Sequence, residues 1–262
     1  MNEHAFLASE RRTQPVAGAA ISVIVPTCDR PDYLREALAS VLAQTLPPGE
    51  LLVIDNGTGA RDEAQWHPLI RHYRLASRVG PSRARNFGAA MAVGDYLAFL
   101  DDDDWWEPDF LREAVAVMAR ERARCVYGRK VASRDGMVSP YKLASREDLT
   151  IATLLRRNPG TGGMNLVIER QLYLELGGFD ERLFVSEDRA LALEMLLAGV
   201  SIAIAPDAVA VVRQHDAERL RRHSLRKLGF VWKYRRLHTP AGLIAAVSRI
   251  VGRALWPWHR AA

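Results

Sequence analysis

The sequence is poor in cysteine and lacks a long hydrophobic run, and both absences exclude classes of protein. Its 262 residues include two cysteines, Cys28 and Cys125, too few for a disulfide framework or a zinc knuckle. Residues 241–251 form the longest apolar candidate, but Ser248 and Arg249 interrupt it before the roughly 18 apolar residues of a membrane span. The first 19 residues have an early acidic residue and no apolar run, unlike a secretory signal. We therefore expect a cytoplasmic protein.

Internal repeats and low-complexity segments are also lacking. Hydrophobic residues make up 48% and charged residues 26% of the chain, which is typical of a globular protein and excludes a disordered, collagen-like or coiled-coil chain. The charge is uneven, because residues 213–262 contain 12 Lys and Arg against 2 Asp and Glu, a net charge of +10. Residues 1–212 then have a net charge of −5, since the whole chain has a net charge of +5. We expect a flexible extension over 1–19, one domain over 20–213 and a basic helical tail over 214–262.

Short apolar runs alternate with amphipathic segments in the first half of the chain. This alternation predicts an α/β fold, with a mostly parallel sheet flanked by helices. The predicted strands are Ile21–Pro26, Glu50–Asp55, His72–Leu75, Asp95–Leu100 and Cys125–Val131, and the predicted helices are Pro31–Gln44, Ser82–Ala92 and Pro108–Arg122.

The second half has weaker periodicity. We expect a loop with a short helix over Arg134–Asn158, and a strand entering a turn at Thr161–Val167. The other predicted elements are helices at Glu169–Leu176 and Glu187–Ala198, β-rich edges at Ser201–Ala205 and Ala208–Val212, and tail helices within Arg219–Arg236 and Ala241–Trp258.

Carboxylates follow three of the predicted strands. Asp29, Asp55 and the run Asp101–Asp104 each come just after a strand, and the carboxyl ends of parallel strands form the functional edge of such a sheet. Four consecutive aspartates repel one another unless a divalent cation or basic side chains neutralise them. A solvated turn that caps the next helix is the alternative, but the position beside two other acidic strand ends favours an Mg²⁺ or Mn²⁺ site.

Two further segments carry candidate chemistry. Glu187 and Asp188 open a predicted helix, where the helix dipole alone favours acids, but a carboxylate beside a metal site also suits a general base. Arg83 and Arg85 lie near the start of another helix, a position that suits phosphate, although such arginines more often pair with surface acids.

Four segments together resemble glycosyltransferase family 2. They are VIVPTCDRPDYLREALASVLAQT, LLVIDNGT, ARNFGAAMAVGDYLAFLDDDD and GGFDERLFVSEDRALALEML, and they span roughly residues 21–215. The resemblance implies a GT-A fold, with a Rossmann-like nucleotide-binding half, and an inverting enzyme that uses a nucleotide-sugar donor.

The resemblance also implies roles for individual residues. Asn56 stands where the family often has a second acid, which leaves donors other than UDP-sugars open. The residues that match donor-binding positions are Pro26, Thr27, Asp29, Arg30, Asp55, Asn56, Arg85, Asn86, Asp101 and Asp102.

The metal and the proton acceptor are assigned by the same resemblance. Asp101 and Asp103 match the family's DXD pair, which holds Mn²⁺ or Mg²⁺ and the ribose-diphosphate, and Asp102 and Asp104 lie within reach of the same ion, so the sequence leaves open which of the four binds it. Asp188 matches the catalytic base, with Glu187 beside it. His215 matches a histidine that often follows the last strand and could reach the metal, although a surface histidine without a ligand fits its position equally well.

The predicted reaction moves a single sugar to a hydroxyl acceptor, which could be lipid-linked or a glycan. No Gln-x-x-Arg-Trp segment follows Asp188, which argues against processive synthesis, and Gly160, Gly162 and Gly163 could form a loop that admits the acceptor. The alternatives are a non-catalytic nucleotide-sugar-binding scaffold, a sugar-nucleotidyltransferase and a haloacid-dehalogenase-like phosphatase. The last two lack their expected motifs here, and a scaffold would usually have lost one of the acids.

The tail allows two interpretations. Its basic residues are interleaved with Trp, Phe and Leu, which fits an anionic membrane surface and would hold the protein at the inner membrane face. Packing on the catalytic domain is the alternative. Nucleic acid is not an expected partner, because the remaining body is acidic.

Overall fold

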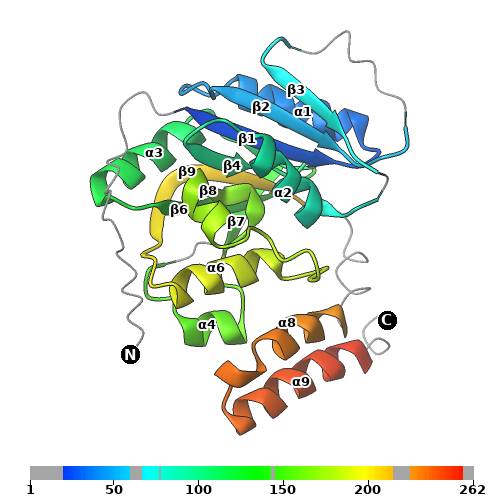
Figure 1. The fold of residues 1–262 in the computed structure, drawn as a ribbon, viewed down its shortest axis with the longest axis vertical. Coiled ribbons are helices and arrows are strands. Elements are labelled where there is room, and N and C mark those ends of the chain that lie inside the picture. The colour runs from blue at the N-terminus through cyan, green and yellow to red at the C-terminus, as the bar shows by residue number, and fades with distance from the viewer. Residues whose placement is uncertain (1–19, 60–66, 77, 143–144, 215–224, 256–262) are drawn as a thin grey trace, which may run out of the picture.

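The computed structural model describes residues 20–59, 67–76, 78–142, 145–214 and 225–255. For residues 253–255 it describes the main chain alone. Helices cover both faces of one twisted sheet, and the helices of the tail lie beside the helical layer of one face (Figure 1). The strands are β1 Ile21–Thr27, β2 Glu50–Asp55, β3 Ile70–Arg74, β4 Tyr96–Phe99, β5 Trp105–Trp106, β6 Cys125–Arg134, β7 Met137–Lys142, β8 Leu166–Glu169 and β9 Ala203–Arg213. The helices are α1 Pro31–Leu42, α2 Pro81–Met91, α3 Phe110–Glu121, α4 Ile151–Arg156, η2 Gly163–Asn165, α5 Arg170–Glu175, α6 Glu187–Leu197, η3 Leu225–Lys227, α8 Leu228–Lys233, η4 Arg235–Leu237 and α9 Pro240–Leu255.

The first half of the sheet is parallel, as the alternation of strands and helices predicts. The strand order begins β3-β2-β1-β4, and all three pairings are parallel. Residues of β1, β2 and β4 are fully buried, which explains why their sequences are continuous apolar runs. The parallel register brings Thr27 opposite Asp55, so the ends of β1 and β2 lie side by side.

The second half of the sheet is mixed. The order continues β8-β6-β9-β5, in which β8 is antiparallel to both neighbours and β6 is parallel to β9. The prediction of two separate β-rich edges between residues 201 and 212 is wrong, because β9 is one strand that pairs on both sides. The register shifts where Gly128 and Arg129 face Ala205 and Val209, and this irregularity accommodates Pro206.

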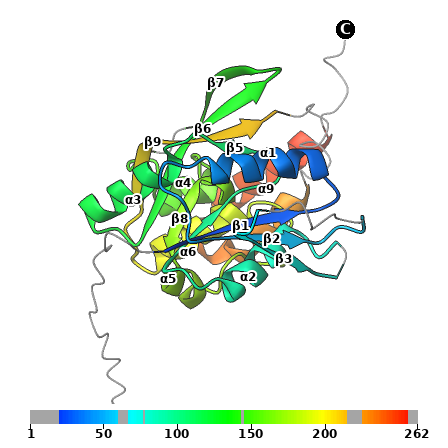
Figure 2. The ribbon, with the colours of Figure 1, turned by 90° about the horizontal axis from the view of Figure 1, so that it is seen from above.

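A strand within residues 134–158 was not predicted. Helix α4 is the short helix expected there, but β7 precedes it and pairs with β6 across a tight turn. Met137 and Val138 of β7 are exposed, and the hairpin stands out from the body in Figure 2. A strand that packs on nothing shows no alternation of buried and exposed residues, so the hydrophobic pattern gave no signal.

Two hydrophobic cores lie on the two faces of the sheet. One core packs α1 and α3 against the sheet, through residues that include Leu38 and Phe110. The other packs α2, α4, α5 and α6 on the opposite face, and it also contains Phe230 and Tyr234 of the tail. The tail therefore contributes to the core of the domain.

The expected basic helix over 219–236 is interrupted in its described part. Residues 225–237 form η3, α8 and η4 instead of one helix. Phe230 lies under the guanidinium group of Arg189 on α6, 3.5 Å from the ring centre, and the Tyr234 hydroxyl donates to Glu194 at 2.7 Å. Packing on α6 thus decides the path of the chain. Among the described helices, none combines the length and the hydropathy that crossing a bilayer requires.

Candidate active site

A cleft of about 470 Å³ opens at the carboxyl ends of β1, β2 and β4. It is bounded on one side by the start of α2 and on the other by the start of α6. The residues that line it are Pro26, Thr27, Cys28, Arg30, Asn56, Arg78, Gly80, Pro81, Arg85, Asp101, Asp102, Asp103 and Glu187.

The four consecutive aspartates divide into two pairs. Asp101, Asp102 and Asp103 all line the cleft, but only Asp101 and Asp103 have partly exposed side chains. Asp102 is buried, and its carboxylate accepts hydrogen bonds from the Thr27 hydroxyl at 2.8 Å and the Cys28 amide at 3.3 Å. Asp104 is also buried and accepts from the Arg213 amide at 2.9 Å. Burial raises the pKa of both carboxyls, and their neighbouring aspartates raise it further.

Arg30 ties the acidic loop to the end of β1. One guanidinium nitrogen lies 3.0 Å from Asp102 and 2.7 Å from Asp103. Burial acts to lower the pKa of this guanidinium, but the charges of Asp103 and Asp102 outweigh it and raise the pKa. Arg30 therefore offsets part of the repulsion that the sequence predicts for four adjacent carboxylates.

Arg85 joins the acidic loop to α6. Its buried guanidinium pairs with Asp101 and lies 3.6 Å from the carboxylate of Glu187. Its Nε has no hydrogen-bond partner within the described residues, and the group faces the cleft. Burial acts to lower the pKa of Arg85, but Asp101 and Glu187 raise it further than burial lowers it. The buried guanidinium of Arg85 thus lies between the carboxylates of Asp101 and Glu187 and pairs with both.

Glu187 and Asp188 occupy different surroundings at the start of α6. Glu187 lines the cleft, and burial, followed by the charge of Asp188, raises the pKa of Glu187 to about 7. Asp188 accepts a hydrogen bond from Asn158 at 3.2 Å, and Asn158 also donates to the Thr161 carbonyl at 2.7 Å. Asp188 is therefore attached to the glycine-containing loop over residues 158–163.

Two residues expected at the donor site hold the main chain of the loop after β2, but their side chains do not line the cleft. Asp29 accepts hydrogen bonds from the amides of Thr58 and Gly59, at 2.8 and 2.9 Å. Asp55 is fully buried and accepts from the Gly57 amide at 2.8 Å. Neither side chain lines the cleft, whereas the adjacent Asn56 does.

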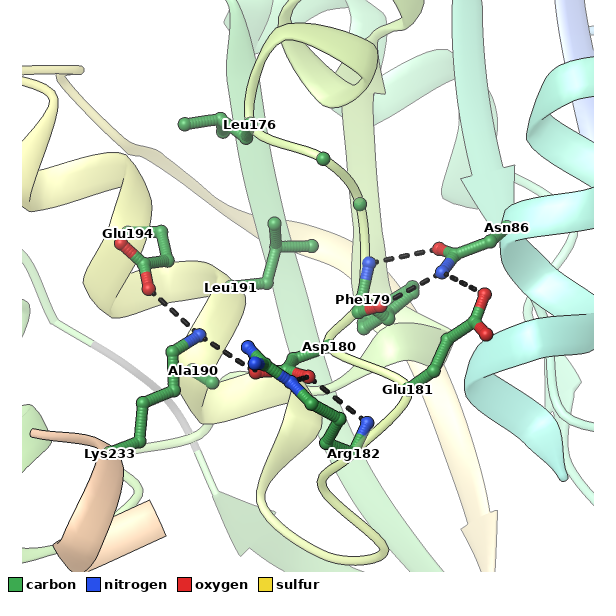
Figure 3. A pocket seen from close by; sticks show the side chains of 12 residues that line it. Asn86, Leu176, Phe179, Asp180, Glu181, Arg182, Ala190, Leu191, Glu194 and Lys233 are labelled. Atoms are coloured by element: carbon green, nitrogen blue, oxygen red, sulfur yellow. Dashed lines mark hydrogen bonds and ion pairs between the residues drawn. The ribbon is translucent and has the colours of Figure 1, made fainter. Parts of the chain in front are cut away.

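Asn86 lines a second pocket and not the cleft (Figure 3). Its amide oxygen accepts from the Phe179 amide at 2.9 Å and from the Tyr173 hydroxyl at 2.6 Å. Its nitrogen donates to the Phe179 carbonyl at 2.8 Å and to Glu181 at 3.0 Å. Asn86 thus fixes the turn that leads to α6, and acts on the cleft through that turn.

The tail reaches the same pocket. Lys233 of α8 lies 3.0 Å from Asp180 and 2.9 Å from Glu194, as Figure 3 shows. Hydrogen bonds from Arg182 and Lys233 lower the pKa of Asp180. These ion pairs connect α8 to both the turn at Asp180 and the middle of α6.

Sequence reasoning did not assign Cys28, Arg78, Gly80 and Pro81, which also line the cleft. Cys28 is part of the run that follows β1, and the other three immediately precede or begin α2, so the rules for strand ends and helix starts could have found them. His215 lies outside the described residues. Within the described parts of the chain, no group of three or more His, Cys, Asp or Glu is arranged around a metal position.

The chain is similar in sequence to two proteins that are named for biosynthesis. The chain is 34% identical over 154 residues to the succinoglycan biosynthesis protein ExoW of Rhizobium meliloti, covering 54% of this chain and 47% of ExoW. It is 31% identical over 204 residues to the succinoglycan biosynthesis protein ExoO of the same organism, covering 72% of this chain and 59% of ExoO. The chain therefore spans about half to three fifths of these relatives.

Solved glycosyltransferase structures share the fold. S. aureus TarS 1-349 in complex with UDP superposes with a TM-score of 0.60 at 19% identity, covering 81% of this chain and 65% of TarS 1-349. GalNAc-T7 with UDP, GalNAc and Mn²⁺ gives a TM-score of 0.60 at 17% identity, covering 75% of this chain and 44% of GalNAc-T7. These likenesses confirm the expected GT-A fold.

The family model "Glycosyl transferase family 2" matches residues 22–175, which hold β1 to β8 and the acidic loop. The match covers more than half of the chain, so the protein belongs to glycosyltransferase family 2.

Proposed function

We propose that this chain transfers one sugar from a nucleotide-diphosphate sugar to a hydroxyl group of an acceptor, with inversion at the anomeric carbon. The cleft carries the proposal, because Arg30 and Arg85 face a group of carboxylates there at the ends of neighbouring strands. Guanidinium groups bind phosphate oxygens through paired N–H donors. The same-fold TarS structures with UDP and with UDP-GlcNAc support a nucleotide-sugar donor.

The donor lies along the cleft in this proposal. Pro26, Thr27 and Asn56 contact the nucleoside, and the arginines and Asp101 contact the diphosphate. The side chains of four further residues hold the loops around the cleft: Asp29, Asp55 and Asn86, which do not line it, and the buried Asp102, which does. Arg78 adds a third guanidinium to the phosphate end.

The donor set of the cleft fits a divalent cation. Asp101 and Asp103 offer carboxylate oxygens, and Mg²⁺ or Mn²⁺ typically takes one or two carboxylates and completes its shell with water and substrate phosphates. When bound, the cation would neutralise charge on the diphosphate leaving group. Asp104 is directed at the main chain of Arg213, so Asp101 and Asp103 are the proposed ligands, with His215 as a further candidate.

Asp188 is the proposed general base. It would accept the proton of the acceptor hydroxyl as that oxygen attacks the anomeric carbon from the face opposite the leaving group. Its hydrogen bond from Asn158 holds the carboxylate at the glycine-containing loop, where the acceptor would enter. Glu187 faces the donor side with Arg85 and is proposed to orient that arginine.

The alternative is a non-catalytic scaffold that binds a nucleotide sugar. A scaffold would bind the nucleotide sugar without transferring the sugar, whereas the proposed enzyme would bind the donor and transfer its sugar. The acceptor is proposed to be a lipid-linked sugar or a glycan, in keeping with the biosynthetic relatives. A single transfer per encounter is proposed because no Gln-x-x-Arg-Trp segment follows Asp188.

Nucleotide binding should depend on a divalent cation and on Asp103. Calorimetric titration with UDP, GDP, dTDP and CDP, each with Mn²⁺ and with EDTA, should identify one nucleotide that binds more tightly with the metal. Asp103→Asn should weaken that metal-dependent binding at least tenfold, or about 1.4 kcal/mol, because one metal-binding carboxylate is lost. Asp135→Asn, in an exposed turn, is the matched control and should bind as the wild type does. Binding of one nucleotide with equal affinity in EDTA would contradict the metal assignment, and no binding at all would contradict the donor site.

Loss of the base should stop transfer without loss of the donor. Asp188→Asn should reduce turnover by roughly 10²- to 10⁴-fold and leave nucleotide affinity unchanged, because the proton acceptor is removed while its size is kept. Glu187→Gln should instead alter donor affinity above pH 7, where Glu187 is ionised and the substitution removes a charge beside Arg85. Near wild-type turnover by Asp188→Asn, measured by release of the nucleotide in the presence of acceptor, would rule out this base.

The raised pKa of Glu187 should be visible in stability. The folded chain holds a proton on Glu187 up to about pH 7, whereas the unfolded chain releases it near the ordinary pKa of 4.5. The free energy of unfolding should therefore fall as pH rises from about 4.5 to 7. Urea titrations in metal-free buffer should show this fall to be smaller in Glu187→Gln, by up to about 3 kcal/mol over that interval. If the two proteins respond equally to pH, Glu187 is not the titrating group.

The outer side of the tail is proposed to bind anionic lipid. Trp232 and Ile244 are 70% and 69% exposed, and the described residues 225–255 include basic side chains but no Asp or Glu. Exposed aromatic and aliphatic side chains among arginines suit the interface of an anionic bilayer.

Vesicle binding tests this surface with the full chain, because truncation would remove the packing of Phe230 on α6. The wild type should sediment with vesicles of anionic phospholipid and stay in solution with neutral ones. Ile244→Asp should reduce sedimentation several-fold, whereas Val93→Asp, at a residue that is 78% exposed on another part of the surface, should reduce it little. Equal retention of both variants would contradict this surface.

A further inference from the structure

Arg213 connects three segments that meet beside the acidic loop. It is the last residue of β9, and it lies outside residues 22–175, which the family model matches. Its backbone amide donates to the carboxylate of Asp104 at 2.9 Å, and its Nε donates to the carbonyl of Asp103 at 3.1 Å. The main chain and the side chain of one residue therefore hold two consecutive residues of the loop.

The guanidinium of Arg213 is itself held in place. It lies over the ring of Tyr33 on α1 and over the ring of Trp105 on β5, 4.9 Å from each ring centre. A terminal nitrogen also pairs with Glu36 on α1. Two aromatic contacts and an ion pair restrict a side chain that would otherwise have several rotamers, so its bond to the loop is preorganised.

Other residues support the rest of the loop. Thr27, Cys28 and Arg30 hold the carboxylate of Asp102, and the Asp104 amide closes a turn onto the Asp101 carbonyl at 3.2 Å. Asp103 is held at two points, its carboxylate by Arg30 at 2.7 Å and its carbonyl by Arg213 at 3.1 Å. Arg213 is therefore the contact that fixes the main chain from which the Asp103 carboxylate extends.

We propose that Arg213 is a positioning residue for the metal- and diphosphate-binding aspartate Asp103, acting through the main chain of the acidic loop. The inference rests on the proposed function, in which Asp103 binds a divalent cation. Lysine would keep the charge, but it lacks the Nε donor and the planar group that stacks between two rings. Arg213→Lys should therefore restore little of what Arg213→Ala loses.

Nucleotide binding measured with Mn²⁺ and with EDTA tests this role without an acceptor. For the nucleotide that the wild type binds, Arg213→Ala and Arg213→Lys should each weaken affinity in Mn²⁺ by about tenfold and leave affinity in EDTA within about twofold. Arg35→Ala removes another arginine of the same neighbourhood, an exposed partner of Asp32, and should match the wild type in both buffers. A folded Arg213→Lys with wild-type affinity in Mn²⁺ would overturn the proposal, and so would an equal loss in both buffers, which a general loosening of the cleft would cause.

A double-mutant cycle separates action through Asp103 from a structural effect. If Arg213 acts through Asp103, the double variant Arg213→Lys with Asp103→Asn should bind in Mn²⁺ no more weakly than Asp103→Asn alone. Additive losses would overturn the proposal. Circular dichroism and urea unfolding identify any variant that does not fold, and Arg213→Lys then replaces Arg213→Ala. If the wild type binds no nucleotide in a metal-dependent way, the proposed function fails. If the wild type shows metal-dependent binding and the Arg213 variants bind equally well in Mn²⁺, only the role of Arg213 fails.

Discussion

The structure around the cleft depends on the balance between crowded carboxylates and buried arginines. The loop after β4 brings Asp101, Asp102 and Asp103 to this edge of the sheet, and the start of α6 brings Glu187. Arg30 and Arg85 enter this group from the end of β1 and from α2, and each bridges two acids. Their pairing is favourable because the cleft is partly desolvated, where an unpaired charge would be costly. We propose that Asp101 and Asp103, which line the cleft, hold the cation that neutralises a diphosphate.

The same arginines couple parts of the chain that are distant in sequence. Arg85 joins the acidic loop after β4 to the start of α6, about a hundred residues later. Asn86, the next residue, fixes the turn before α6 by hydrogen bonds to the main chain of Phe179. Two adjacent residues of α2 therefore place both the candidate metal ligands and the candidate base.

The tail contributes both to the fold and to the surface. Its inner side, with Phe230, Lys233 and Tyr234, packs on α6 and on the turn at Asp180. Its outer side leaves Trp232 and Ile244 exposed among basic residues. The two interpretations of the basic tail are thus compatible, since packing uses one side of the helices and leaves the other available. The contact with α6 also means that the boundary between domain and tail at residues 213 and 214 does not separate two independent cores.

Much of the fold could be predicted because its signals are local. Buried parallel strands such as β1, β2 and β4 are continuous apolar runs, and helices such as α1 begin at a proline and have apolar residues at helical spacing. The exposed hairpin strand β7 and the single strand β9 were not predicted, because one buries no face and the other contains a proline at an irregularity in its pairing.

The sequence by itself determined the α/β class, the alternation that makes one half of the sheet parallel, and the placement of acids after three strands. It also contained the motifs that identify the family. Only the tertiary structure decided which acids face the cleft, because the direction of each side chain in Asp101–Asp104 depends on partners far along the chain. Thr27 and Arg213 hold the carboxylates of Asp102 and Asp104 in buried positions, whereas Asp101 and Asp103 keep partly exposed side chains at the cleft, which Asp102 also lines. Hydrogen bonds between residues that are 75 and 109 positions apart have no local signal, so no reading of neighbouring residues could have assigned them.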